Sequence, residues 1–219
     1  MLRYLGHFYQ LLAVVVTVFV GLLGHNLVQA WVAVRLGDRE PARQRFTRLD
    51  LRKHLEPLGA VAVFLAYFGW GFAAAVPITA RFRRQRGRAT VALASGPLFL
   101  LGWTYGMVAL LRLAERTTNV HLGEFAVYAA TTSAGLFVLS LLPVPPLTGG
   151  RLLFLYAPTS PGWQRARYRL TETTAGPLIA LAIVLLPVLF PLLPDIVGEL
   201  ADPLLRALGH SLHVGDPVA

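Results

Sequence analysis

The chain has 219 residues, of which 55% are hydrophobic and only 14% charged, with a mean hydropathy of +0.58. A soluble domain of this size carries about 25% charged residues, so the composition excludes an ordinary soluble enzyme and favours a polytopic membrane protein. The absence of Cys excludes disulfides and thiolate metal sites, and the net charge of +9 is clustered between apolar runs rather than arranged for nucleic acid.

Five apolar runs follow one another along the chain. They cover about residues 8–34, 57–78, 89–113, 125–142 and 175–193. At a rise of 1.5 Å per residue, runs of about twenty residues cross a hydrocarbon core of about 30 Å. The sequence therefore predicts an all-α, polytopic transmembrane helical bundle with about four full spans, in which Trp70, Trp103 and Trp163 act as interface anchors.

The charges between the runs predict an unusual path for the second one. Residues 35–56, 81–88 and 151–172 carry net charges of +3, +5 and +3, and the positive-inside rule places all three in the cytoplasm. Because the first two flank residues 57–78, a single crossing by that run would separate them. We therefore predict that 57–78 re-enters on one side, with an ordinary crossing as the alternative.

The C-terminal tail differs from the apolar runs. Residues 195–208 have apolar positions spaced for an amphipathic helix, and residues 209–219 have the composition of a frayed end. We therefore predict one integral membrane domain over 1–194 and an amphipathic or frayed tail over 195–219.

The first apolar run contains a motif that fits a zinc site only in part. Zinc proteases carry His-Glu-x-x-His on a helix, where two imidazoles share one face and the Glu handles the proton of the bound water. Here the three positions are His25, Asn26 and Gln29. Asn is not a base at neutral pH, and a Gln carbonyl is a poor zinc ligand beside imidazole.

Five segments together carry a resemblance. They are Gly24-His25-x-x-x-Gln29-Ala30, His54-Leu55-Glu56-Pro57-Leu58-Gly59, Phe68-Gly69-Trp70, Ala94-Ser95-Gly96-Pro97-Leu98 and Leu141-Leu142-Pro143-Val144-Pro145-Pro146-Leu147-Thr148-Gly149-Gly150-Arg151. In this order they resemble the motifs of the site-2 proteases, which are intramembrane zinc metalloproteases. The resemblance covers about residues 20–155 and implies a membrane bundle of that type.

The sequence departs from the family pattern at the positions expected to bind zinc and to act as the base. The resemblance implies zinc ligands at His25, Gln29 and Thr148 and a base at Asn26, and only His25 keeps the expected residue type. Ser140 replaces an expected Asn. We predict that no metal or other cofactor is bound and that the polar side chains hydrogen-bond to one another.

The predicted function is that of a catalytically inactive, site-2-protease-like protein in the bacterial cell membrane, with its basic loops in the cytoplasm. The cleft that binds substrate in the active proteases would hold a transmembrane helix of a protein partner, or the chain would be an accessory subunit of a membrane complex. Membrane lipid is also a predicted partner, and nucleic acid is not. The predicted cleft residues are Gly96, Pro97, Ser140, Pro145, Pro146, Gly149 and Gly150.

Three simpler or different interpretations remain open at this point. The segment 145–150 could be only a helix break and turn, since Pro and Gly interrupt spans. The chain could also be an active zinc metalloprotease with an unusual site. A transport role is the second alternative, although no acidic residue is predicted at mid-bilayer depth, where ion-coupled carriers usually keep one.

Overall fold

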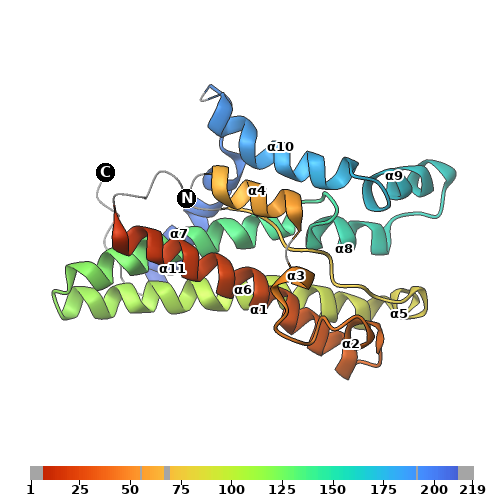
Figure 1. Ribbon diagram of the computed structural model, residues 1–219, viewed down its shortest axis with the longest axis horizontal. Helices are drawn as coiled ribbons and strands as arrows, with labels where there is room; N and C mark the ends of the chain where they lie inside the picture. Colours follow the sequence, from red (N-terminus) through yellow and green to blue (C-terminus); the bar gives the residue numbers. More distant parts are fainter. Residues whose placement is uncertain (1–6, 55, 67–69, 191, 212–219) are drawn as a thin grey trace.

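Helices dominate the computed structural model, which describes residues 7–54, 56–66, 70–190 and 192–211. The longest are α1 (Phe8–Arg35), α6 (Arg86–Arg116) and α7 (Val120–Leu141), with 28, 31 and 22 residues. They run side by side (Figure 1), and each is long and apolar enough to cross a membrane. The chain is an integral membrane protein, and the predicted all-α polytopic bundle is confirmed.

Small residues bring these three helices close together. Because lipid tails are as apolar as Leu, helices in a membrane associate through close packing and interhelical hydrogen bonds. The Thr104 hydroxyl of α6, which is fully buried, lies 3.0 Å from Ser133 Oγ of α7. The face of α7 in the bundle carries the buried residues Ala126, Ala129, Ala130 and Ala134.

The two described arms of the segment 57–78 lie against each other, and its re-entry on one side of the membrane stays a prediction. Helix α4 (Pro57–Leu65) has nine residues, which is too short to cross a bilayer, and the chain returns in extended form from residue 70. The two arms touch, because a Cβ added to Gly59 would lie 1.9 Å from the carbonyl oxygen of Phe72. Phe68 and Gly69, which belong to the family motif, lie outside the described residues.

The base of this hairpin is held by the short helix α3 (Leu51–His54). The backbone N–H of Ala74 donates to the carbonyl of His54 at 2.8 Å, and the buried His54 ring donates from Nε2 to the carbonyl of Arg48 at 2.9 Å. His54 therefore has a structural role in this loop. Trp70 is only 3% exposed and packs against Gly135, so its prediction as an interface anchor was wrong.

The fifth apolar run forms a shorter helix than predicted. It follows α8 (Thr148–Tyr156) and α9 (Pro161–Thr171) as α10 (Ala175–Leu189), which has 15 residues and ends four residues before the predicted limit. Pro187 removes a helical hydrogen bond in its last turn. The described chain thus has three clear spans, or four if α9 and α10, bent by 69° to each other, form one broken span.

The tail contains one helix, which extends to residue 211 and so includes residues 209–211 of the segment predicted to be frayed. Helix α11 (Ile196–Ser211) begins after Asp195, whose side chain accepts a hydrogen bond from the N–H of Gly198 at 3.1 Å. Its buried Ala201 packs on α7 against Ala134 and Val138. The rest of the predicted tail, residues 212–219, lies outside the described residues, and the division at residue 194 stays a prediction.

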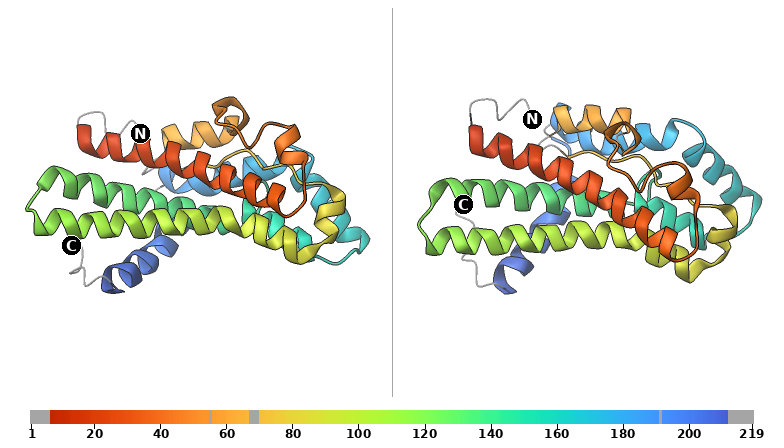
Figure 2. Two further views of the ribbon diagram at one scale, coloured as in Figure 1. Left: turned by 90° about the horizontal axis from the view of Figure 1, so that it is seen from below. Right: turned by 60° about the horizontal axis from the view of Figure 1, so that its bottom comes forward.

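The three basic segments gather at one end of the bundle. The short helices α2 (Glu40–Arg43) and α5 (Ala80–Arg84) lie at the same end as α9, opposite the turn that joins α6 to α7 (Figures 1 and 2). Their clustering agrees with the prediction that these segments share one side of the membrane. That this side is the cytoplasm stays a prediction.

Candidate functional site: a buried polar cluster

Three polar side chains of α1 point into the bundle. His25, Asn26 and Gln29 are 8%, 1% and 2% exposed, on a helix that is otherwise strongly apolar. Because His25 and Gln29 are four residues apart, they share one face of the helix. Buried polar groups cost free energy unless they find hydrogen-bond partners, so the partners of these three residues define the site.

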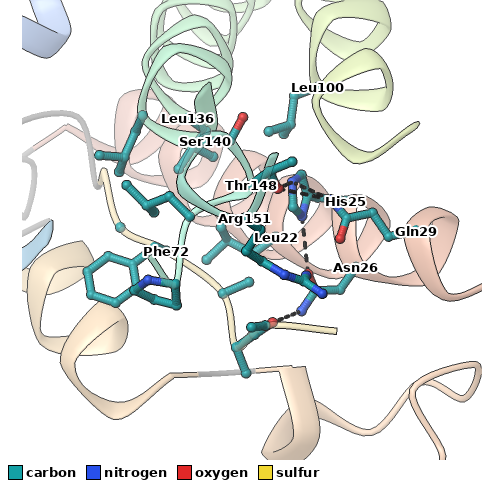
Figure 3. A pocket seen from close by; sticks show the side chains of 17 residues that line it. Leu22, His25, Asn26, Gln29, Phe72, Leu100, Leu136, Ser140, Thr148 and Arg151 are labelled. Atoms are coloured by element: carbon teal, nitrogen blue, oxygen red, sulfur yellow. Dashed lines mark hydrogen bonds between the residues drawn. The ribbon is translucent and has the colours of Figure 1, made fainter. Parts of the chain in front are cut away.

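Thr148, the first residue of α8, completes the group (Figure 3). Its hydroxyl oxygen lies 3.2 Å from His25 Nε2 and accepts a hydrogen bond from Gln29 Nε2 at 2.9 Å. Gln29 Nε2 lies 3.4 Å from His25 Nε2, so the three atoms form a nearly equilateral triangle. We call His25, Asn26, Gln29 and Thr148 the polar cluster.

The hydrogen bonds of the polar cluster have one consistent direction. His25 donates from Nδ1 to Asn26 Oδ1 at 3.1 Å and accepts at Nε2 from the Thr148 hydroxyl. Asn26 Nδ2 donates onward to the carbonyl of Ala74 at 2.8 Å. These partners assign His25 as the neutral Nδ1–H tautomer, since both ring nitrogens are then satisfied.

Gly96 and Pro97 build the α6 wall of this site. Pro97 has no N–H, so the carbonyl of Leu93, four residues earlier, receives no helical hydrogen bond from it. Gln29 Nε2 donates to that carbonyl at 2.8 Å and so satisfies it. A Cβ added to Gly96 would lie 2.6–2.7 Å from atoms of Gln29 and His25, so the missing side chain allows α1 to approach α6.

Replacing Gln29 by Leu is expected to destabilise the protein by about 1 kcal/mol, because the carbonyl of Leu93 would stay buried without a donor. Adding Pro97→Ala supplies an N–H to that carbonyl and should recover part of the loss. The free energy of unfolding in detergent is measured for the wild type, both single variants and the double variant. Gln10→Leu is the control on the same helix. If Pro97→Ala changes the free energy of unfolding equally with and without Gln29, the hydrogen bond from Gln29 does not compensate for the N–H that Pro97 lacks.

A small cavity of about 30 Å³, enough for about two water molecules, adjoins the polar cluster. Of the predicted cleft residues, Ser140 and Pro146 line it, together with the extended chain at residues 71–75 (Figure 3). Gln29 Oε1 is buried and has no hydrogen-bond partner among the described residues. The site therefore contains one buried acceptor that no described residue satisfies.

The other predicted cleft residues do not line this cavity. A Cβ added to Gly149 would lie 1.9 Å from the carbonyl oxygen of Leu141, and one added to Gly150 would lie 2.3 Å from the nitrogen of Pro145. The two glycines let the start of α8 fold against the end of α7, which brings Thr148 to His25. The backbone that lies close to these two glycines thus belongs to this chain and not to a bound partner.

Arg151 belongs to the site, although the sequence analysis assigned it no role. It lines the cavity and donates from Nη2 to the carbonyl of Val76. Burial, with a smaller contribution from the positive charge of Arg83, lowers the pKa of Arg151 to about 10, so it stays charged at neutral pH. The sequence feature that could have identified Arg151 is its position at the end of the longest motif, one helical turn beyond Thr148.

The polar cluster does not fit a catalytic zinc ion. Tetrahedral ligands bound to zinc at 2.0–2.1 Å lie about 3.3 Å apart, so the 2.9–3.4 Å triangle has suitable dimensions. Its chemistry is unsuitable, because an amide and an alcohol accompany one imidazole and neither carries a negative charge. Among the described residues, no group of three or more His, Asp or Glu side chains could hold a metal ion.

The chain is similar to two curated bacterial proteins. It is 31% identical over 197 residues to "Putative zinc metalloprotease YwhC" of Bacillus subtilis (strain 168), covering 82% of this chain and 84% of the relative. It is also 31% identical over 183 residues to "Putative zinc metalloprotease Rip2" of Mycobacterium tuberculosis (strain ATCC 25618 / H37Rv), covering 82% and 66%. No family model matches the chain, and no solved structure matches it.

The similarity to YwhC extends over 82% of this chain and 84% of the relative. The five ordered motifs, and the membrane bundle in which two of them meet at His25 and Thr148, are consistent with that similarity. On these grounds the chain belongs to the site-2 protease family.

Proposed function

We propose that this chain is a metal-free member of its family that does not cleave peptide bonds. The hydrogen-bonded polar cluster supports this proposal, because Gln29 and Thr148 take two of the three ligand positions and are bound to each other. Asn26 stands at the base position, with its amide donating to Ala74. Loss of a general base alone lowers a rate by about 10²–10⁴-fold.

The proposed role is to bind a transmembrane helix of another protein, or to act as an accessory subunit of a membrane complex. The small cavity supports this role, since side chains of the polar cluster and the extended backbone at residues 71–75 line it together. Polar groups at membrane depth are costly and usually functional. At about 30 Å³ the cavity admits one side chain, so a partner helix would dock at its mouth rather than inside. In this proposal the protein sits in the bacterial cell membrane with its basic segments in the cytoplasm.

Cross-linking from Ser140 tests the proposed role. The chain has no Cys, so Ser140→Cys introduces a single thiol in the cavity wall, which a thiol-reactive photo-cross-linker modifies. In native membranes we expect an adduct whose mass spectrum places the link in an apolar helix of another protein. Thr131→Cys, on the same helix and away from the cavity, is the matched control.

Two outcomes would contradict the proposed role. The first is equal adduct formation from both thiols, which would show random contact in the bilayer. The second is an adduct from Ser140→Cys with lipid alone. A captured helix must also co-purify with the unmodified chain to count as a partner.

The names of the two relatives favour one alternative, an active zinc metalloprotease. In this alternative the ion would require ligands that the described cluster does not supply. One zinc per purified wild-type chain, together with chelator-sensitive cleavage of a helical substrate, would establish it and would overturn the proposed function.

A further inference from the structure

A second and larger cavity, of about 610 Å³, lies at the end of the bundle where the basic segments gather. Its volume is within the range of about 300–1,000 Å³ that small-molecule sites usually have. Residues of α5, α6, α8 and α9 contribute to its walls, so four separate elements meet there. Its cationic side chains are Arg83, Arg84, Arg86, Arg151 and Arg167.

These arginines have little compensating negative charge. Among the described residues, the side-chain ion pair is Arg43–Glu40 in α2, and neither residue lines this cavity. Glu172 is the one carboxylate that acts on Arg83, whose pKa is lowered by burial and then by the charge of Arg167. Partly buried like charges repel one another, so an anion between them would relieve the repulsion.

The remaining wall is apolar and aromatic. Trp163 and Phe154 pack edge to face with ring centroids 6.0 Å apart, and both line the cavity. The guanidinium of Arg86 lies 5.7 Å from the centre of the Tyr156 ring, which orients it at the rim. A cavity with a cationic wall and an apolar wall suits an anion that carries a non-polar portion.

We propose that this cavity binds a phosphate-bearing anion, held by Arg83, Arg151 and Arg167. Guanidinium groups bind phosphate through paired hydrogen bonds, which favours phosphate over a simple halide. An anionic phospholipid headgroup and a soluble phosphate compound share this chemistry. The proposal does not depend on whether the polar cluster is catalytic, since its own observations are the cavity, its five arginines and the small amount of negative charge near them.

Calorimetric titration of the full chain in neutral detergent tests the proposal. The probes are inorganic pyrophosphate and a short-chain phosphatidylglycerol below its micelle concentration. We expect saturable binding of at least one probe, weakened at least ten-fold in Arg83→Gln/Arg167→Gln. The matched control is Arg81→Gln/Arg88→Gln, which removes the same charge from residues outside the cavity lining and should change affinity less than two-fold.

Each outcome of this titration decides the proposal. Binding of both probes identifies phosphate itself as the ligand group, binding of phosphatidylglycerol alone identifies a lipid headgroup, and binding of pyrophosphate alone identifies a soluble ligand. No saturable binding, or equal weakening by both double variants, would overturn the proposal. If Arg83→Gln/Arg167→Gln does not fold, the single variant Arg167→Gln, at an exposed position, replaces it.

Discussion

Zinc should bind at about one ion per chain when Asn26→Glu, Gln29→His and Thr148→Asp are combined. The substitutions supply a second imidazole, a carboxylate and a base at positions whose polar atoms already lie 2.9–3.4 Å apart. Elemental analysis after dialysis measures the metal. Bound zinc should also raise the free energy of unfolding, by about 2.7 kcal/mol when free zinc is one hundred times its dissociation constant.

The double variant Asn26→Glu/Gln29→His is the matched control, because it lacks the carboxylate ligand at Thr148 and should retain far less zinc. The wild-type chain should retain none after the same dialysis. Stoichiometric zinc in the wild type would contradict the proposed loss of metal. An empty triple variant that folds normally would show that the side-chain positions, and not only their chemistry, have departed from those of a zinc site.

Gly149→Ala should destabilise the protein strongly, with an expected loss of about 3 kcal/mol of unfolding free energy. The added Cβ would lie 1.9 Å from the carbonyl oxygen of Leu141, and a helix backbone cannot move aside as a flexible side chain can. The start of α8 would have to shift, which would also separate Thr148 from His25. Thermal unfolding in detergent measures the loss.

Gly102→Ala in α6 provides the control for this substitution. Nothing lies within 4 Å of its added Cβ, so the change should be neutral or stabilise the helix by up to about 1 kcal/mol. Equal stability of the two variants would mean that α8 does not pack against the end of α7 as closely as described.

Much of the fold follows from hydropathy along the chain, which is a local property. The run predicted over 8–34 forms α1, and residues 125–141 of the fourth run lie within α7, because long apolar stretches must be helical in a bilayer. The same reasoning overestimated the length of the last run, where the helix ends at Leu189, two residues after Pro187. Trp70 was also misplaced, because burial against Gly135 depends on a contact that no local pattern records.

The candidate site could be predicted in part. Motif order identified His25, Asn26, Gln29 and Thr148, because the order and spacing of the motifs are properties of the sequence alone. It did not identify the carbonyl of Leu93 as a partner of Gln29, nor the bond of Arg151 to Val76. Both are backbone contacts between segments far apart in sequence, and side-chain motifs carry no information about them.

By itself, the sequence determined that the chain is a helical membrane protein and that His25, Gln29 and Thr148 stand where the family resemblance implies zinc ligands, since both depend only on which residues are present and in what order. The tertiary structure alone decided that Gln29 and Thr148 bond to each other. It also decided that Gly149 is needed for packing within the chain and that five arginines surround one cavity. The physical reason is that these properties depend on distances between helices, which hydropathy and spacing along one chain do not specify.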